Sequence, residues 1–374
     1  MPPKVVTPGL RAEPIEKSKT SETKSAPRSG GGVRVWGALA LVLLAAVAAV
    51  AAALLVGPAH LSLAEAAGAV ARRLVGRRGA VGWQDTVIVQ VRLPRALVAL
   101  LVGGGLAVAG ATLQGLFRNP LADAGVLGVS SGASLGAVLA IYLHLAARAV
   151  WTLPACAFLG AAADALLVFS ISARRGRGRL FSGTLLLVGV AVGALNVSLT
   201  TFILSVALSS YDAGRQVVYW LLGGLEARTW DHLLLGAPAV LVGVAIIAAS
   251  ARELDALLLG ELGAASVGVD VPRVRLRLVL ASALVVGAAV AIAGPIGFVG
   301  LLVPHVVRLA VGPGHRTLLP LSFVGGGIFL VVADLVARTL LAPAEIPVGV
   351  VTAAVGAPVF LALLVRRRSE VAAS

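Results

Sequence analysis

The charged side chains that could recognise a ligand in this chain are arginines at the ends of apolar segments. Arg92 and Arg95 form an RLPR tetrapeptide ahead of one such segment, and Arg338 lies four residues after Asp334. A guanidinium stays ionised, and its planar fork matches the two oxygens of a carboxylate. Such side chains are therefore suited to binding carboxylates rather than to covalent chemistry.

Groups for nucleotide hydrolysis, disulfide formation and metal binding are scarce. All lysines (Lys4, Lys17, Lys19 and Lys24) precede the apolar part of the chain, so the phosphate-binding pattern G-x-x-x-x-G-K-[ST] cannot occur there. The single cysteine, Cys156, excludes an internal disulfide. We therefore predict no catalytic residue, no metal site and no cofactor on this chain; any ATP and magnesium would be bound by a partner. No two of the five histidines share a ligand spacing on one helix, and four of them (His60, His144, His232 and His315) are expected at solvated helix ends, whereas His305 is expected to pack.

Composition places these residues in a membrane. Of the 374 residues, 59% are hydrophobic and 13% are charged, and the mean hydropathy is +0.98. This balance is typical of a polytopic membrane protein, and we expect an all-α fold. Apolar runs long enough to cross about 30 Å of hydrocarbon predict ten helices. They cover residues 36–57, 93–115, 122–145, 150–172, 184–208, 233–250, 276–293, 297–311, 320–340 and 347–365.

Two tails flank the membrane domain predicted at residues 36–366. Residues 1–35 are polar and rich in Pro, Ser, Lys and Gly, which predicts a disordered segment because too little apolar surface is present for a core. Residues 367–374 form a short C-terminal tail. Ten spans put both tails on one side, and most of the 31 Lys and Arg residues fall on that side. The positive-inside rule therefore predicts that both termini are cytoplasmic.

One outer connection is an exception to that rule. Basic groups on the outer face, against the usual bias, indicate an acidic partner there. The alternative is that the positive-inside rule is only statistical and that residues 61–76 form a solvated surface helix. The six arginines concerned are Arg72, Arg73, Arg77, Arg78, Arg92 and Arg95.

The stretch from Arg92 to Leu139 predicts a helical hairpin buried in the membrane. Two apolar segments flank a polar hinge at residues 118–123, in which Pro120 fixes a turn. In the second segment Gly128, Gly132 and Gly136 recur every four residues. One helix face is therefore nearly flat, and a neighbouring backbone can approach it closely.

Several long motifs resemble those of FecCD-type permease subunits, which belong to bacterial importers of iron chelates, haem and cobalamin. In chain order they are RLPR, NPLA, GVSSGA, GPIGFVGLLVPHVVRL and ADLVARTLLAPAEIPVGVVTAAVGAPVF. The resemblance covers residues 36–366 and implies a type II ABC importer permease that works by ATP-driven alternating access. It implies a location in the bacterial inner membrane, among lipid and without nucleic acid. The implied partners are a second copy of the chain, two ATPase subunits and a periplasmic substrate-binding protein.

The resemblance also implies roles for the outer arginines. Arg92, Arg95 and Arg338 match family positions that pair with glutamates of the binding protein. For Arg338 an alternative remains open, namely an ion pair within its own helix to Asp334.

The connection at about residues 252–275 resembles the segment that couples the permease to its ATPase. Leu259 to Val267 is expected to form a short helix whose small residues 263–265 permit close docking, while Glu261 binds a basic group of the ATPase. Leu262 stands where many relatives have a second acidic residue. Any amphipathic loop helix could look similar, which is the alternative. The coupling residues expected are Leu259, Gly260, Glu261, Ala264, Ala265 and Gly268.

A cytoplasmic gate and a transport pathway are implied by further matching positions. The gate residues expected are Asn119, Leu121, Ser182 and Gly183, with a purely structural capping role as the alternative for Asn119. The pathway candidates are Ser130, Ser131, Asn196, Thr200, Arg215 and Tyr219, although Ser and Thr commonly bond their own helix backbone. Asp164 is costly at membrane depth and must face protein or water.

The expected substrate rests only on how one stretch of the sequence resembles those of family members. The stretch QGLFRNPLADAG looks most like haem permeases, so haem is the first expectation, a ferric siderophore the second and cobalamin the third. The rival from another class is a secondary transporter driven by an ion gradient, which needs a relay of intramembrane carboxylates and an internal repeat. Only Asp164 and Asp334 approach such a relay.

Overall fold

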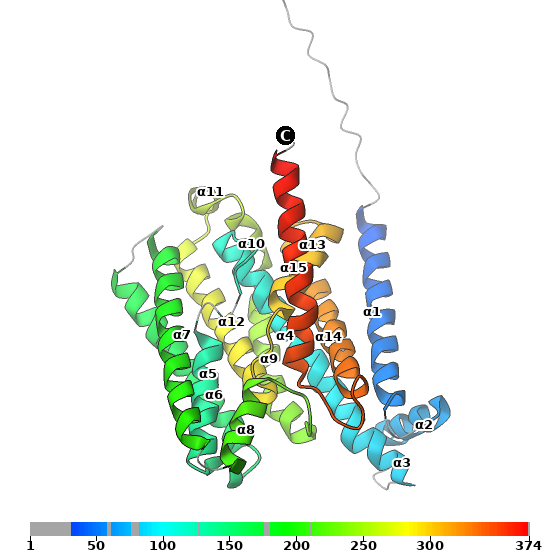
Figure 1. The fold of residues 1–374 in the computed structure, drawn as a ribbon. Coiled ribbons are helices and arrows are strands. Elements are labelled where there is room, and N and C mark those ends of the chain that lie inside the picture. Colours follow the sequence, from blue (N-terminus) through cyan, green and yellow to red (C-terminus); the bar gives the residue numbers. More distant parts are fainter. Residues whose placement is uncertain are drawn as a thin grey trace, which may run out of the picture.

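The computed structural model describes residues 31–57, 61–75, 82–123, 125, 128–175, 180–208 and 211–372, and the regular elements in these ranges are helices (Figure 1). The all-α fold class is therefore confirmed. Each of the ten predicted segments corresponds to a helix. These are α1 (Gly31–Leu55), α4 (Leu93–Phe117), α5 (Val129–Tyr142), α6 (Thr152–Arg175), α7 (Leu180–Ala207), α9 (Trp230–Ala249), α12 (Val271–Ala293), α13 (Val299–Val311), α14 (His315–Thr339) and α15 (Val348–Ala372).

Six described helices are long and apolar enough to cross a membrane, and four shorter apolar helices accompany them. The boundaries differ from prediction where a polar first turn belongs to the helix. For example, α12 begins at Val271 because the Asp270 side chain accepts a hydrogen bond from the Arg273 backbone N–H. At the N-terminus α1 already begins at Gly31, and residues 1–30 of the predicted tail lie outside the described residues.

Short helices connect the long ones, and the sequence analysis predicted only two of them. The predicted surface helix is α2 (Leu63–Leu74), and the predicted coupling helix is α11 (Glu261–Ser266). Those not predicted are amphipathic or too short for a hydropathy signal. They are α3 (Trp83–Thr86), the π-helical segment η1 (Val87–Arg92), the 3₁₀ turn η3 (Leu145–Ala147), α8 (Tyr211–Leu221) and α10 (Ala251–Leu257).

Helix α4 forms the centre of the domain. It continues α3 and η1, so Trp83–Phe117 is one rod of 35 residues that is largely buried. Close packing against α13 requires glycine at Gly110, because a Cβ there would overlap the carbonyl oxygen of Gly300. Since small residues let helix backbones meet, α4 packs tightly against α13 and α14.

The flat face predicted on α5 is confirmed for two of its three glycines. A Cβ on Gly132 would collide with the Gly160 carbonyl of α6, and one on Gly136 would collide with the Cys156 carbonyl. Gly128 has another role: it is the N-cap of α5, with φ of 80°. The hairpin of α5 and α6 is therefore held by backbone contact.

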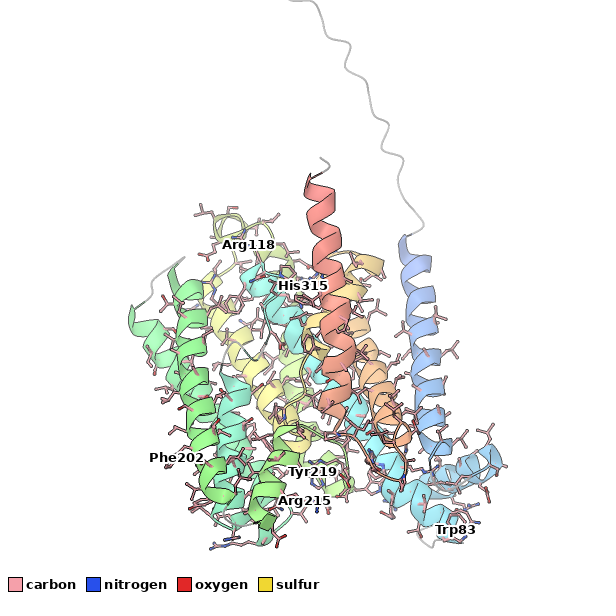
Figure 2. All side chains as sticks on the ribbon, in the orientation of Figure 1. Trp83, Arg118, Phe202, Arg215, Tyr219 and His315 are labelled. Atoms are coloured by element: carbon pink, nitrogen blue, oxygen red, sulfur yellow. The ribbon has the colours of Figure 1, made fainter. Side chains whose placement is uncertain are left out.

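The domain has two ends (Figures 1 and 2). We call the end with α2, α3, α8 and the start of α4 the arginine end, and the end with α10 and α11 the foot end. Helix α1 begins and α15 ends at the foot end. Figure 2 shows Arg215 and Tyr219 toward the arginine end, with Arg118 and His315 at the foot end. Between the ends, α6, α7 and α9 expose apolar faces, for instance at Leu187 and Phe202, which suit lipid or another membrane chain.

Candidate functional site

Two of the three predicted docking arginines bind the end of α1. The Arg92 Nη1 donates to the carbonyls of Leu54 and Leu55 at 2.7 and 3.0 Å, and the Arg338 Nη2 donates to the Ala53 carbonyl. These oxygens belong to the last turn of a helix, where carbonyls lack intrahelical partners and the helix dipole is negative. Both arginines are buried. They therefore satisfy the C-terminus of α1 in this conformation.

The third docking arginine bridges two carboxylates of its own chain. Arg95 donates from Nε and Nη2 to Asp334 at 2.8–3.0 Å, and from Nη1 and Nη2 to Glu345 at 3.2 and 2.9 Å. The Asp334 carboxylate thus accepts from Arg95, whereas the alternative interpretation placed Arg338 on it. The side chains of Arg95 and Asp334 are only 10% and 4% exposed, while that of Glu345 is 32% exposed. Glu345 is therefore the accessible member of this network.

The structure brings the three arginines to one end of the molecule but leaves each guanidinium engaged. An external carboxylate must therefore compete with internal acceptors, and Glu345 is the least buried of these. Docking by these arginines remains a prediction. It requires that the arginines exchange their internal acceptors for carboxylates of the partner.

The remaining arginines of the outer connection are partly explained by internal contacts. The Arg72 Nη2 lies 2.6 Å from Asp85 Oδ1, and the Arg73 guanidinium lies 5.7 Å from the centre of the Trp230 ring. Helix α2 also carries a capping box between Ser62 and Glu65. The structure therefore shows the predicted surface helix; Arg77 and Arg78 lie outside the described residues.

At the foot end, one leucine of α11 and one in the turn before it face solvent. Leu259 is 69% exposed and Leu262 is 82% exposed. The expectation for Ala264 is corrected, since it is fully buried and packs inward rather than forming a docking face. Glu261, expected to bind a partner's basic group, lies 2.7 Å from the chain's own Arg275. The surface open to a partner is therefore more apolar than predicted.

A buried histidine connects the foot end to the membrane helices. His315, the first residue of α14, directs both its backbone N–H and its Nδ1 to Asp255 Oδ1 of α10, at 2.7 and 2.8 Å. Its Nε2 is buried without a hydrogen-bond partner among the described residues. Because an ionised carboxylate can only accept, Nδ1 carries a proton in its contact with Asp255. The expectation that this histidine is solvated is wrong, because helix packing buries the start of α14.

Gln114 makes a second connection at the foot end, from α4 to α13. Its Nε2 donates to the carbonyls of Gly300 and Leu301 at 3.2 and 3.1 Å, and its Oε1 accepts from Arg308 at 3.1 Å. Sequence reasoning missed these residues as functional candidates. A glutamine within a long apolar helix is the signal that could have identified the position.

The predicted gate residues are only partly described. The Asn119 Oδ1 accepts from the Leu121 backbone N–H at 2.9 Å, which is the capping role held open for it. Leu121 is 42% exposed, and Gly183 has open space around it. The Ser182 side chain lies outside the described residues. Gating by these positions stays a prediction.

Two pathway candidates meet a buried carboxylate in the membrane. The Asn196 amide of α7 donates to Asp164 of α6 and to Ser131 of α5, the latter at 3.3 Å. Asp164 is buried against protein, as predicted. This cluster joins α5, α6 and α7. Thr200 is buried nearby on α7, and Ser130 is half-buried on α5. On α8, Tyr219 is exposed and Arg215 lies 5.4 Å from the centre of its ring.

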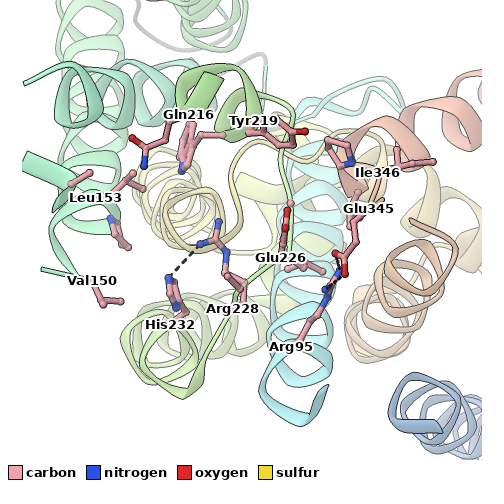
Figure 3. A pocket seen from close by; sticks show the side chains of 18 residues that line it. Arg95, Val150, Leu153, Gln216, Tyr219, Glu226, Arg228, His232, Glu345 and Ile346 are labelled. Atoms are coloured by element: carbon pink, nitrogen blue, oxygen red, sulfur yellow. Dashed lines mark hydrogen bonds and ion pairs between the residues drawn. The ribbon is translucent and has the colours of Figure 1, made fainter. Parts of the chain in front are cut away.

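A cavity of about 450 Å³ opens beside the arginine network (Figure 3). Its walls come from the α5–α6 and α14–α15 connections, from α8, and from the loop between α8 and α9. Arg95 and Glu345 form one side, and Arg228 with His232 forms the opposite part. Sequence reasoning named neither Arg228 nor Glu345.

Groups of three or more His, Cys, Asp or Glu side chains that could hold a metal ion do not occur among the described residues. The geometry instead offers charge recognition at one end and an apolar protrusion at the other.

Comparison with known proteins gives consistent results. A sequence model described as the FecCD transport family matches residues 40–366. The cobalamin import system permease protein of Halobacterium salinarum is 46% identical over 75% of this chain and 73% of its own length. The hemin transport system permease protein of Yersinia pestis is 43% identical over 75% and 83%. The vitamin B12 import system permease protein of Vibrio cholerae is 44% identical over 77% and 85%.

A solved structure shares the architecture. It shows the inward-facing conformation of a metal-chelate type ABC transporter, and it matches with a TM-score of 0.77 and 32% identity. The match covers 90% of this chain and 99% of that one. The type II permease fold implied by the sequence motifs is thereby confirmed.

Proposed function

Because the chain belongs to the FecCD transport family and is an ABC importer permease, we propose that it imports a metal chelate of the tetrapyrrole type, either haem or cobalamin. Haem is the first expectation from the motif around Asn119. Relatives named for cobalamin are as similar as the relative named for hemin, at 44–46% against 43% identity. Cobalamin therefore ranks equally with haem, ahead of a ferric siderophore.

The assembly proposed is two copies of the chain, two ATPase subunits at the foot ends and one substrate-binding protein at the arginine ends. The exposed leucines at the foot end, Leu259 in the turn before α11 and Leu262 on α11, carry this proposal, because solvent-facing apolar side chains are matched by a cleft in a soluble partner. The apolar faces of α6 and α7 would bury against the second copy or lipid. In this arrangement the arginine end is periplasmic and both termini are cytoplasmic, in the inner membrane.

Transport follows from alternating access between the two ends. ATP binding and hydrolysis in the partner move α11, and the contacts from Asp255 to His315 carry that movement into α14. The chain itself performs no covalent step. An ion-gradient mechanism is disfavoured by the family membership, and Asp164 is held by Asn196 within a packed cluster rather than in a relay.

The test is reconstitution of the chain with its ATPase in lipid nanodiscs. ATP hydrolysis is measured with binding proteins carrying cobalamin, haem or a ferric siderophore, and with each binding protein empty. We expect a loaded tetrapyrrole carrier to stimulate hydrolysis most. The substrate assignment fails if only the siderophore carrier stimulates, and the importer assignment fails if the chain accumulates substrate in vesicles without an ATPase.

A further inference from the structure

The tryptophans and tyrosines of the chain gather at the arginine end. All three tyrosines and four of the five tryptophans lie in helices or connections of that end, whereas Trp36 lies near the start of α1 at the foot end. The four tryptophans are Trp83, Trp151, Trp220 and Trp230. Trp and Tyr collect where lipid headgroups meet hydrocarbon. The level of these rings therefore marks one boundary of the membrane.

Helix α2 is held at the level of these tryptophans by its two arginines. The Arg73 guanidinium lies 5.7 Å from the centre of the Trp230 ring. Arg72 donates from Nε and Nη2 to the carboxylate of Asp85 at 3.1 and 2.6 Å, and Asp85 follows Trp83 by two residues in α3. Both arginines are therefore engaged within the chain, and both contacts tie α2 to the aromatic level.

One face of α2 packs inward against the end of α1 and against η1. Ala66 and Ala69 share an apolar cluster with Leu54 of α1 and with Ile88 and Val89 of η1. Leu54 is the residue whose carbonyl accepts from Arg92. The position of α2 is therefore coupled to the last turn of α1.

Another face of α2 is apolar and exposed. Four residues at intervals of four lie along one side of the helix, and we call them the outer stripe: Leu63, Ala67, Ala71 and the C-cap Val75. Leu63 is 65% exposed and Val75 is 79% exposed. Figure 1 shows α2 at the edge of the domain, beside α1. The outer stripe thus faces away from the helix bundle at the level of the membrane boundary.

We propose that α2 is an interfacial anchor whose outer stripe is buried in lipid, where the headgroups meet the acyl chains. Lipid is the occupant because the aromatic level places α2 at that boundary and because Arg72 and Arg73 are already engaged, which leaves an apolar rather than a charged face outward. The anchor fixes the depth of the α1 end to which Arg92 binds. The inference requires only that the chain spans a membrane, and it depends neither on the substrate nor on the proposed assembly.

The test measures how lipid and water reach a nitroxide label on the outer stripe. The full chain carries Ala67→Cys in a Cys156→Ala background, which removes the single native thiol, and is reconstituted with its ATPase in lipid nanodiscs. Collision rates are measured with oxygen, which concentrates in lipid, and with a water-soluble nickel chelate. We expect the label to lie about 5–10 Å below the headgroup surface. Ala71→Cys gives the same measurement if Ala67→Cys fails to fold.

Two labelled positions provide matched references. Glu226→Cys, at an exposed residue of the arginine end, reports water, and Leu241→Cys, at an exposed residue in the middle of α9, reports hydrocarbon. The oxygen-to-chelate collision ratio on the outer stripe should exceed that at Glu226→Cys at least twofold and stay below that at Leu241→Cys. A ratio equal to that at Glu226→Cys overturns the anchor and leaves the importer assignment intact. A water-like ratio at Leu241→Cys overturns the membrane placement and the anchor with it.

Two further measurements separate lipid from a protein occupant. Addition of the substrate-binding protein should leave the mobility of the label unchanged, since lipid already covers the outer stripe. Immobilisation of the label by that protein assigns the face to protein docking and overturns the proposal. Spin–spin broadening between labels on two copies of the chain assigns the face to their interface, with the same consequence.

Discussion

The two ends of the molecule present opposite kinds of surface. At the arginine end, the predicted docking groups Arg92, Arg95 and Arg338 are buried and bound to acceptors of their own chain. At the foot end, Leu259 and Leu262 are largely exposed, while the polar groups beside them are paired internally. At the arginine end these charged groups are paired within the chain, whereas at the foot end apolar side chains are exposed to solvent.

This difference indicates two modes of association. A partner at the foot end gains by burying leucines and displaces nothing, which suits a permanent complex. A partner at the arginine end gains only the difference between new and existing ion pairs. Such exchange gives modest affinity, sensitivity to salt and easy reversal, which suits a binding protein that must leave after each delivery.

The largest expected effect comes from breaking the buried network. Arg95→Gln leaves Asp334 buried without its cation, and we expect a loss of roughly 3–5 kcal/mol in the free energy of unfolding. Thermal unfolding in detergent measures it. The double variant Arg95→Met with Asp334→Leu removes both charges and should recover most of the loss. If Arg95→Gln were as stable as wild type, the network would not stabilise the fold, and the proposed difference between the two ends would be wrong.

A smaller effect is expected from placing a charged side chain on the exposed surface of the foot end. Leu262→Asp removes an apolar contact of about 1.5–3 kcal/mol and places a carboxylate in the interface. Association with the ATPase should fall by a factor of about 10–100, since each 1.4 kcal/mol is tenfold. Co-purification with titrated ATPase measures this. Leu63→Asp, an equally drastic change at an exposed residue of α2, is the control and should retain the ATPase.

The smallest effect concerns the exposed partner of Arg95. Glu345→Gln removes one internal competitor while Asp334 still holds the arginine in place. Because a part-exposed ion pair contributes about 0–1 kcal/mol, we expect the binding protein to dock up to fivefold more tightly. Equilibrium binding at low salt measures it. Weaker docking would mean that Glu345 itself contacts the partner, and the exchange mechanism would need revision.

Some of these features could be predicted from the sequence, and others could not. Hydropathy located all ten apolar helices because each contains a continuous run of apolar side chains, whether it packs inside the protein or faces outward. It missed α8 and α10, because short amphipathic helices lack such a run. The spacing of Gly132 and Gly136 predicted a close helix contact, which α6 supplies. Arg228 was missed because an arginine in a polar loop looks like any solvated charge.

The sequence by itself determined the membrane class, the ten long or apolar helices, the family and the residue types available at each end. These depend on local composition and on motifs that survive in any conformation. Which acceptor each arginine binds, whether Ala264 faces inward and whether His315 is buried were decided only by the tertiary structure. The reason is that Arg95 and Asp334, like His315 and Asp255, are distant in the chain and meet only after the helices have packed.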